Sequence, residues 1–273
     1  MGQRLQGFAI AFLLLGAPLL AGAVPEPKLR APEAGIYGVK EGDWLYTRSL
    51  DQAVPVASLT KLALALTFVR MTRDMDQVIT ITGEDWLHAG RTRLRVGDRL
   101  PARTLLRLAL VASDNCAARA LTHPSGLSWE SYAFLMEQTA RSVGCRHASF
   151  SDPTGLDPRD VASARDVVLL FNAALLHPLL RDCLGTSEFI LETSRGPRNI
   201  VHSARLLRYR CDVTAAKTGY IDEAGYCLVQ YVTDPQGDFV TVLLGAPSEA
   251  ARVRESMRLI EHARALRKRA PGT

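Results

Sequence analysis

The sequence predicts an α/β fold of the α+β kind, in which strands from the two ends of the chain meet in one sheet and helices lie between them. Residues 35–49, GIYGVKEGDWLYTRS, alternate around a Glu-Gly-Asp turn, which is the pattern of a β-hairpin. Residues 224–233 and 238–246, AGYCLVQYVT and DFVTVLLGA, are a second pair of expected strands near the other end. The 273 residues suit one large domain or two small ones, and a hydrophobic content of 47% allows a sizeable core.

The N-terminal segment, residues 1–23, is expected to be a signal peptide. One positive residue, Arg4, precedes thirteen mostly apolar residues, FAIAFLLLGAPLL, which are too few to span a membrane comfortably. Ala-Gly-Ala at 21–23 then fits a small-residue cleavage site, so Val24 is the expected mature N-terminus. The alternative is an uncleaved N-terminal anchor, and the absence of a cysteine at the junction argues against a lipoprotein. A Pro-rich leader, residues 24–34, is expected to be irregular.

The middle of the chain is expected to be mainly helical. Helices are expected from Leu62 onward, over 103–111, over 128–143, over 163–176 and, after the last strand, over 248–266. Short strands or extended loops are expected at 77–86 and 92–101, and the turn-rich residues 151–160, SDPTGLDPRD, predict a loop. Ser163 and Asp166 have capping-box spacing, so Asp166 is expected to cap a helix rather than to act as a catalyst.

Charge, cysteine and histidine content point to no particular partner or metal. The net charge is +5, and +4 without Arg4, and a balance this weak predicts no nucleic-acid partner. Five cysteines include no C-x-x-C pair, which argues against a zinc or redox motif, and the odd number leaves at least one unpaired within the chain. Cys211 and Cys227 are expected to be partly buried. Six histidines lie far apart, without H-x-H or H-x-x-x-H spacing, so no metal and no cofactor is expected.

The stretch 54–70, VPVASLTKLALALTFVR, has two interpretations. Ser58 can cap the helix that follows, because serine is a good N-cap and polar residues belong at a helix start. Alternatively Ser58 is a nucleophile and Lys61 its base, because positions three apart share one face of a helix. The Ser-Lys pattern alone does not decide between them.

Lysine is scarce, and its positions are informative. The chain has 28 arginines but only five lysines, at positions 28, 40, 61, 217 and 268. Arginine is therefore the usual cation here, but it cannot give up its proton in a protein, whereas a desolvated lysine can. The composition thus singles out Lys61 as a candidate base. For Lys217, in Lys-Thr-Gly at 217–219, a plain positive charge is enough, and a simple glycine turn is the alternative interpretation. Ser-Asp-Asn at 113–115, which interrupts a helical run, has a similar alternative as a turn between helices.

The motifs S-L-T-K at 58–61, S-D-N at 113–115 and K-T-G at 217–219 occur in the order found in active-site-serine penicillin-binding proteins and class A β-lactamases. Their spacings of 55 and 104 residues, with TGLD, SARD and KTGYIDEAGYCLV, resemble the low-molecular-mass D-alanyl-D-alanine carboxypeptidase/endopeptidase family over about 36–258. Within it the chain is most similar to the short periplasmic D,D-endopeptidases. The resemblance implies a β-lactamase/transpeptidase-like fold, with a five-stranded antiparallel sheet, flanking helices and a helical subdomain. The D,D-peptidase domain is expected over 35–268, with a tail at 269–273.

The resemblance also implies a role for each motif residue. Ser58 would form the acyl-enzyme, Lys61 would take its proton, helped by burial and by the charge of Lys217, and Ser113 would relay a proton to the leaving amine. The substrate-binding residues would be Asn115, Lys217, Thr218, Gly219 and Tyr220. Asn115 would hold a substrate amide, Lys217 and Thr218 the Ser113 hydroxyl and a carboxylate, and Gly219 would let a peptide approach the strand edge. The oxyanion would lie between the backbone amides of Ser58 and Tyr220.

Two departures from the family bear on substrate and location. Carboxypeptidases of the family often carry an arginine in the turn after the last strand, where this chain has LLGAPSEAA with Pro247. A chain-terminal D-Ala thus loses a clamp, which favours cross-links as substrates. No second β-rich domain or amphipathic tail is expected after the last helix. The resemblance thus predicts an exported cell-wall hydrolase, periplasmic or otherwise outside the cytoplasmic membrane, that acts on peptidoglycan stem peptides, is inhibited by β-lactam antibiotics and has no transmembrane anchor after signal cleavage.

Other functions remain open alternatives. A class A-like β-lactamase shares the motifs but needs a glutamate in an E-x-x-x-N-type loop, and the loop 151–160 holds aspartates but no glutamate. A non-catalytic peptidoglycan-peptide-binding protein is possible on the same scaffold, because a fold does not fix a function. An esterase is disfavoured because no G-x-S-x-G occurs, and a zinc D,D-peptidase by the histidine spacing.

Overall fold

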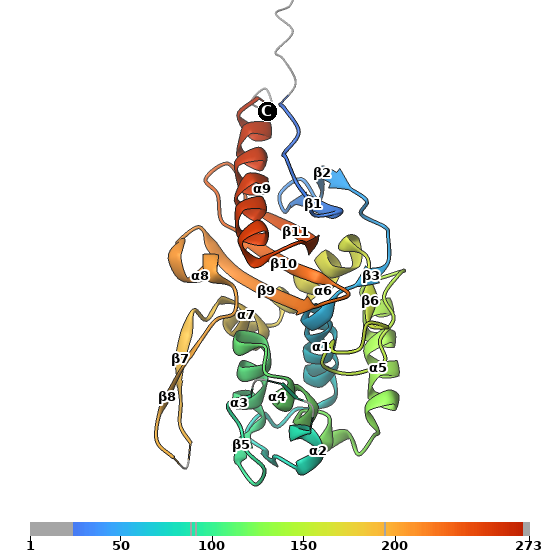
Figure 1. Cartoon of the computed structure of the whole chain (residues 1–273), viewed down its shortest axis with the longest axis vertical. Coiled ribbons are helices and arrows are strands. Elements are labelled where there is room, and N and C mark those ends of the chain that lie inside the picture. Colours follow the sequence, from blue (N-terminus) through green and yellow to red (C-terminus); the bar gives the residue numbers. More distant parts are fainter. Residues whose placement is uncertain (1–23, 88, 91, 194, 270–273) are drawn as a thin grey trace, which may run out of the picture.

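The computed structural model of the chain describes residues 24–87, 89–90, 92–193 and 195–269, so the expected signal peptide lies outside the described residues. Its centre is a five-stranded antiparallel sheet of strand order β2-β1-β11-β10-β9 (Figure 1). These strands are β1 (Glu33–Gly38), β2 (Asp43–Arg48), β9 (Val213–Ile221), β10 (Gly225–Val232) and β11 (Phe239–Ala246). The two expected strand pairs from the ends of the chain therefore meet in one sheet, with β1 against β11.

The sheet is covered on both faces, each by a separate hydrophobic core. On one face, α9 (Glu249–Arg269) packs Leu259 and Ile260 against β11 residues that include Phe239 and Leu243 (Figure 1). On the other face, Val240 and Val242 join the larger core of the helical part. Because successive side chains of a strand point to opposite faces, burial on both faces explains why β11 is an almost continuous apolar run.

The helical part contains α1 through α7 and three short strand pairs. The helices are α1 (Lys61–Met71), α2 (Gly83–Trp86), α3 (Ala102–Arg107), α4 (Asn115–Ala120), α5 (Trp129–Ser142), α6 (Ala164–Leu176) and α7 (Pro178–Gly185), and α8 (Arg205–Tyr209) follows nearer the sheet. The short 3₁₀ helices η1 (Ala57–Thr60) and η3 (His123–Ser125) and the π-helix η2 (Leu108–Ala112) adjoin them. The strand pairs are β3 (Val54–Pro55) with β6 (Val161–Ala162), β4 (Val78–Thr80) with β5 (Arg99–Pro101), and β7 (Glu188–Leu191) with β8 (Arg198–Val201).

Most expected elements are present, and the fold class is confirmed. The hairpin turns at 39–42, and the helix expected over 103–111 ends as η2, just before Ser113. The capping box of Ser163 and Asp166 is formed, so Asp166 is a cap as predicted. Several elements were not predicted: the β7–β8 hairpin, the short pair β3 and β6, and the helices α7 and α8. The helix α2 lies where a strand or extended loop was expected. β9 was also missed, because Lys217 and Gly219 obscure its strand pattern. The Lys-Thr-Gly motif therefore lies within a strand, and its interpretation as a glycine turn is wrong.

The boundaries at both ends of the domain differ slightly from the prediction. β1 begins at Glu33, two residues inside the segment expected to be irregular. The preceding residues are also held in place, because the backbone amides of Arg30 and Ala31 each donate to Glu255 Oε2 of α9 at 3.0 Å. At the other end α9 continues to Arg269, one residue into the expected tail.

Two further expectations concern the state of the cysteines and the presence of a membrane-spanning helix. All five cysteines are free, and Cys211 is exposed rather than partly buried, whereas Cys227 is fully buried. Among the described residues no single helix has the length and apolar character needed to cross a membrane; the bent pair α6 and α7 meets that test only when taken together.

Candidate active site

Ser58 lies in the 3₁₀ turn η1, at the point where the chain enters α1. Ala57, just before it, has a φ of +49°, a left-handed conformation that is uncommon for a residue with a Cβ. Neither η1 nor α1 has a side-chain cap, so the interpretation of Ser58 as an N-cap is wrong. Its hydroxyl is instead 2.7 Å from the amine of Lys61.

Lys61 is completely buried, and its amine has three oxygen neighbours. Lys61 Nζ is 2.7 Å from Ser58 Oγ, 2.7 Å from Asn115 Oδ1 and 2.6 Å from the carbonyl oxygen of Thr154. The orientation of the Asn115 amide follows from its other bond, in which Nδ2 donates to the carbonyl of Ala89. Two of the three neighbours can therefore only accept. A neutral amine has two N–H groups for these two oxygens and one lone pair, which is left to face the Ser58 hydroxyl.

Burial lowers the pKa of the Lys61 amine from its usual value near 10.5 to about 7. The carboxylates of Asp152, Asp114 and Asp160 oppose this fall in pKa, and the Arg119 guanidinium adds to it. Burial, the first of the two expected causes, is the largest, and the repulsion between the Lys61 and Lys217 amines lowers the pKa of Lys217. A buried amine with a pKa near neutrality is well matched to general-base work.

The rate of acylation of the protein by a penicillin is accordingly expected to depend on pH. Only the neutral amine can accept the Ser58 proton, so the rate should rise as pH rises and reach half of its upper value near pH 7. Measurement of the second-order acylation rate constant from about pH 5 to about pH 9 checks this. A rate that is flat or falls across neutrality would contradict the assignment of Lys61 as base.

Ser113 and Lys217 come from different parts of the fold and meet beside this amine. Ser113 ends η2 with a left-handed φ of +59°, and Lys217 lies within β9. Lys217 Nζ donates to Ser113 Oγ and to the carbonyl of Thr218, both at 2.8 Å. Burial lowers the pKa of Lys217 well below its usual value, and the positive charges of Lys61 and Arg252 lower it further.

The other motif residues follow along β9, which is an edge strand of the sheet. Thr218 Oγ1 donates to Ser203 Oγ at 2.7 Å. A Cβ at Gly219 would lie 2.7 Å from the carbonyl oxygen of Val56 and 3.0 Å from the amide nitrogen of Ser58, so only glycine fits there. Tyr220 is half exposed, and its hydroxyl donates to Asp222. All eight residues expected from the motifs are thus gathered around η1 and β9.

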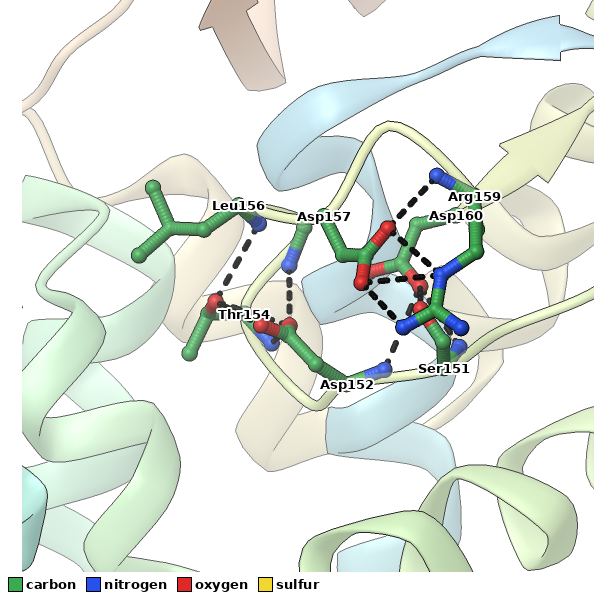
Figure 2. Close-up of polar contacts among 8 residues, drawn as sticks. Ser151, Asp152, Thr154, Leu156, Asp157, Arg159 and Asp160 are labelled. Carbon is green, nitrogen blue, oxygen red and sulfur yellow. Dashed lines mark hydrogen bonds and ion pairs between the residues drawn. The ribbon is translucent and has the colours of Figure 1, made fainter.

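Two contributions were not predicted. Ser203, just after β8, contacts Thr218, and nothing in its local pattern marks it. The loop 151–160 was predicted as a turn but given no role, although it supplies the Thr154 carbonyl (Figure 2). The glycine at position 155 was the one sequence signal that this loop packs closely against another segment. In the structure its φ is +82°, and a Cβ there would lie 2.0 Å from the carbonyl oxygen of Ala57. Elsewhere, in the part of the chain that the structure describes, no cluster of three or more His, Cys, Asp or Glu is placed to hold a metal.

Comparison with known proteins places this site in a family. The sequence pattern of the family described as D-alanyl-D-alanine carboxypeptidase matches residues 21–248. The chain belongs to this family. Among its relatives, a D-alanyl-D-alanine endopeptidase of Pseudomonas aeruginosa is 30% identical over 276 residues, which cover 95% of this chain and 88% of the relative. A D-alanyl-D-alanine endopeptidase of Escherichia coli is 28% identical and covers 83% and 77%.

Solved structures show the same fold. A D-alanyl-D-alanine carboxypeptidase from Mycobacterium tuberculosis has a TM-score of 0.83 at 24% identity, with 90% of this chain and 95% of that chain covered. The Streptomyces K15 DD-transpeptidase has a TM-score of 0.82 at 23% identity, with 89% and 100% covered. Family membership makes the chain a serine-type D,D-peptidase of the low-molecular-mass penicillin-binding class, and the expected family and enzyme class are confirmed.

Proposed function

We propose that this D,D-peptidase hydrolyses D-Ala bonds of peptidoglycan stem peptides through an acyl-enzyme on Ser58. The neutral amine of Lys61 takes the Ser58 proton as Oγ attacks the D-Ala carbonyl carbon, and the carbonyl oxygen becomes an oxyanion. Ser113 then gives its proton to the leaving amine as the peptide bond breaks, and it regains a proton from the protonated Lys61, which becomes neutral again. Water then attacks the ester carbonyl while Lys61 takes one proton from it, and Ser58 Oγ receives that proton as the ester bond breaks. The observation that carries the proposal is the Lys61 amine, which has two carbonyl acceptors and one hydroxyl around it.

The remaining motif residues bind the substrate in this proposal. The edge of β9 receives the peptide as an added strand, and the missing Cβ of Gly219 keeps the Ser58 amide within reach of the oxyanion. The Tyr220 amide is the second oxyanion donor. Lys217 holds Ser113, and Thr218 meets the substrate carboxylate. The side chain of Asn115 already donates to Ala89 and accepts from Lys61, so it orients the base as well as bordering the substrate amide.

We propose further that cross-linked peptides are preferred over chain-terminal D-Ala-D-Ala. A free C-terminus carries a full charge, and desolvating it without a partner is costly. Pro247 after β11 supplies no cation, and the first arginine of α9, Arg252, is nearly buried over the Tyr226 ring, 3.8 Å from Glu249. Three of the relatives are named D-alanyl-D-alanine endopeptidase, which supports the same preference. Lys217 and Thr218 still offer contacts to a carboxylate, so carboxypeptidase activity is weakened rather than lost.

A direct competition tests this preference. Purified pentapeptide monomer and cross-linked dimer are mixed at equal concentration with the protein, and products are quantified by mass spectrometry. The expected result is faster formation of monomer products from the dimer than release of free D-Ala. The opposite order would overturn the endopeptidase preference and leave the D,D-peptidase assignment standing. A Ser58→Ala variant is the control, and it should form neither product.

The last part of the proposal is that the protein is exported across the cytoplasmic membrane. Its support is the leader pattern of residues 1–23 and the location of peptidoglycan outside the cytoplasmic membrane. N-terminal sequencing of the protein recovered from the periplasm should begin at Val24. Recovery of the uncleaved chain from the cytoplasm alone would contradict export.

A further inference from the structure

The loop 151–160 is a tightly bonded unit built around two aspartates (Figure 2). Asp152 Oδ1 accepts the backbone amides of Thr154 and Gly155, the latter at 2.8 Å, and the Thr154 hydroxyl donates to both oxygens of the carboxylate. Asp160 Oδ1 accepts the amides of Ser151 and Asp152 at 2.6 and 3.2 Å. Asp152 therefore holds Thr154 directly, and Asp160 holds the residues that precede it, so the position of the Thr154 carbonyl is fixed.

The same loop is locked against the nucleophile. The Val56 amide donates to the Asp160 carbonyl at 3.1 Å, and Pro55 pairs with Val161. The backbone of Gly155 lies directly on the carbonyl of Ala57. The Thr154 carbonyl, so placed, accepts from Lys61 Nζ at 2.6 Å. A short chain of contacts thus runs from the Asp152 carboxylate through Thr154 to the amine beside Ser58.

Charged groups from several elements act on Lys61. Asp152 and Asp160 come from the loop, Asp114 and Arg119 from the start and the body of α4, and Lys217 from β9. Asp114 is already engaged, because it caps α4 and accepts from Thr92 and from the amide of Arg93. Burial raises the pKa of Asp160 to about 7, and one of its oxygens is buried without a partner. Among the carboxylates, Asp152 opposes the desolvation of Lys61 most strongly.

We propose that Asp152 is a positioning residue that orients the base Lys61 through the Thr154 carbonyl. The negative charge of Asp152 also favours the protonated form of the Lys61 amine. The inference rests on the proposed function of Lys61 as base, and it assigns to the loop a role in tuning that base. Without Asp152 the amine loses a nearby anion that favours its protonated form. It therefore becomes neutral at lower pH, while its lone pair is held less firmly toward Ser58.

The low lysine content makes a direct test possible. Protein labelled with ¹³C at lysine Cε gives signals from only five lysines, and a Lys61→Arg sample identifies the signal of Lys61. The signal is followed from about pH 5 to about pH 11 in the native chain and in Asp152→Asn, which removes the charge and keeps one acceptor oxygen. We expect the native midpoint near 7 and a midpoint lower by at least about half a pH unit in the variant.

Asp157→Asn is the matched control. Asp157 belongs to the same loop, but its carboxylate pairs with Arg159 at the surface and makes no contact with Thr154. Its variant should leave the midpoint of Lys61 unchanged. Asp152→Ser, whose hydroxyl can still accept a backbone amide without a charge, replaces Asp152→Asn if that variant does not fold. An unchanged midpoint in the folded Asp152 variant, or an equal shift in Asp157→Asn, would overturn the proposal.

Acylation of the same samples by a penicillin separates this inference from the proposed function. A native chain that is not acylated would refute the function of Ser58, while the titration of Lys61 would still decide the role of Asp152. If the native chain is acylated, the acid limb of the pH–rate profile of Asp152→Asn should move to lower pH by the same amount as the titration midpoint of Lys61. A purely structural role would lower the rate equally at every pH and leave the limb in place.

Discussion

Lys61→Arg is expected to lower the acylation rate by at least a hundredfold, although it keeps the positive charge. A loss of about a hundredfold is typical of removing a general base, and it corresponds to about 2.7 kcal/mol in activation free energy. Arginine does not give up its proton, so no lone pair is available to the Ser58 hydroxyl. The buried site is also fitted to one amine with contacts of 2.6 to 2.7 Å, which a planar guanidinium does not reproduce. Stopped-flow measurement with a fluorescent penicillin gives the rate.

Lys40→Arg is the matched control for this substitution, because Lys40 is exposed in the turn between β1 and β2. Its acylation rate should equal that of the native chain. Thermal melting of both variants shows whether each is folded. Near-normal acylation of folded Lys61→Arg would mean that position 61 needs only a cation, and the base assignment would fail.

Gly155→Ala is expected to cost at least about 3 kcal/mol in the free energy of unfolding. Its φ of +82° is unfavourable for alanine, and the new Cβ would lie 2.0 Å from the Ala57 carbonyl oxygen, which belongs to backbone and does not move aside easily. Relief of this clash would displace either η1 or the Thr154 carbonyl. Acylation should therefore fall along with stability, measured by urea unfolding.

Gly126→Ala separates backbone strain from the clash. Gly126 has a comparable φ of +66°, but a Cβ there would meet nothing within 4 Å. Its cost should be limited to the left-handed conformation itself, about 1 kcal/mol. Equal losses for the two variants would mean that the contact between the loop 151–160 and η1 contributes little.

The sequence was sufficient for the elements with strong periodicity and for the residues whose type is restricted by chemistry. Alternation around a turn predicted β1 and β2, and capping-box spacing predicted the start of α6. The scarcity of lysine singled out Lys61, because in this chain only a special requirement favours lysine over arginine. Local pattern alone could not reject the helix cap for Ser58, since a serine at a helix start satisfies both interpretations.

The contributions that were missed depend on contacts between distant segments. The Thr154 carbonyl is a backbone group, so its role does not depend on a residue type that a sequence pattern could identify. Its role is shown only by its distance of 2.6 Å from Lys61 Nζ. Lys217 and Gly219 make β9 look like a turn in the sequence, because both residue types are unusual within a strand. In the structure Lys217 donates to Ser113, and only glycine at 219 leaves room for the Ser58 amide. The pKa of Lys61 similarly depends on burial and on carboxylates brought together by the fold.

The most direct test of the central claim, that Ser58 is the nucleophile, is to locate the adduct of a penicillin on the native protein. Trypsin cleavage after Arg48 and Lys61 would release the peptide 49–61, SLDQAVPVASLTK, and tandem mass spectrometry distinguishes Ser58 from Ser49 and Thr60 within it. The expected result is a single adduct on Ser58 that is absent from Ser58→Ala. An adduct on another residue, or no adduct on a folded protein, would contradict the assignment.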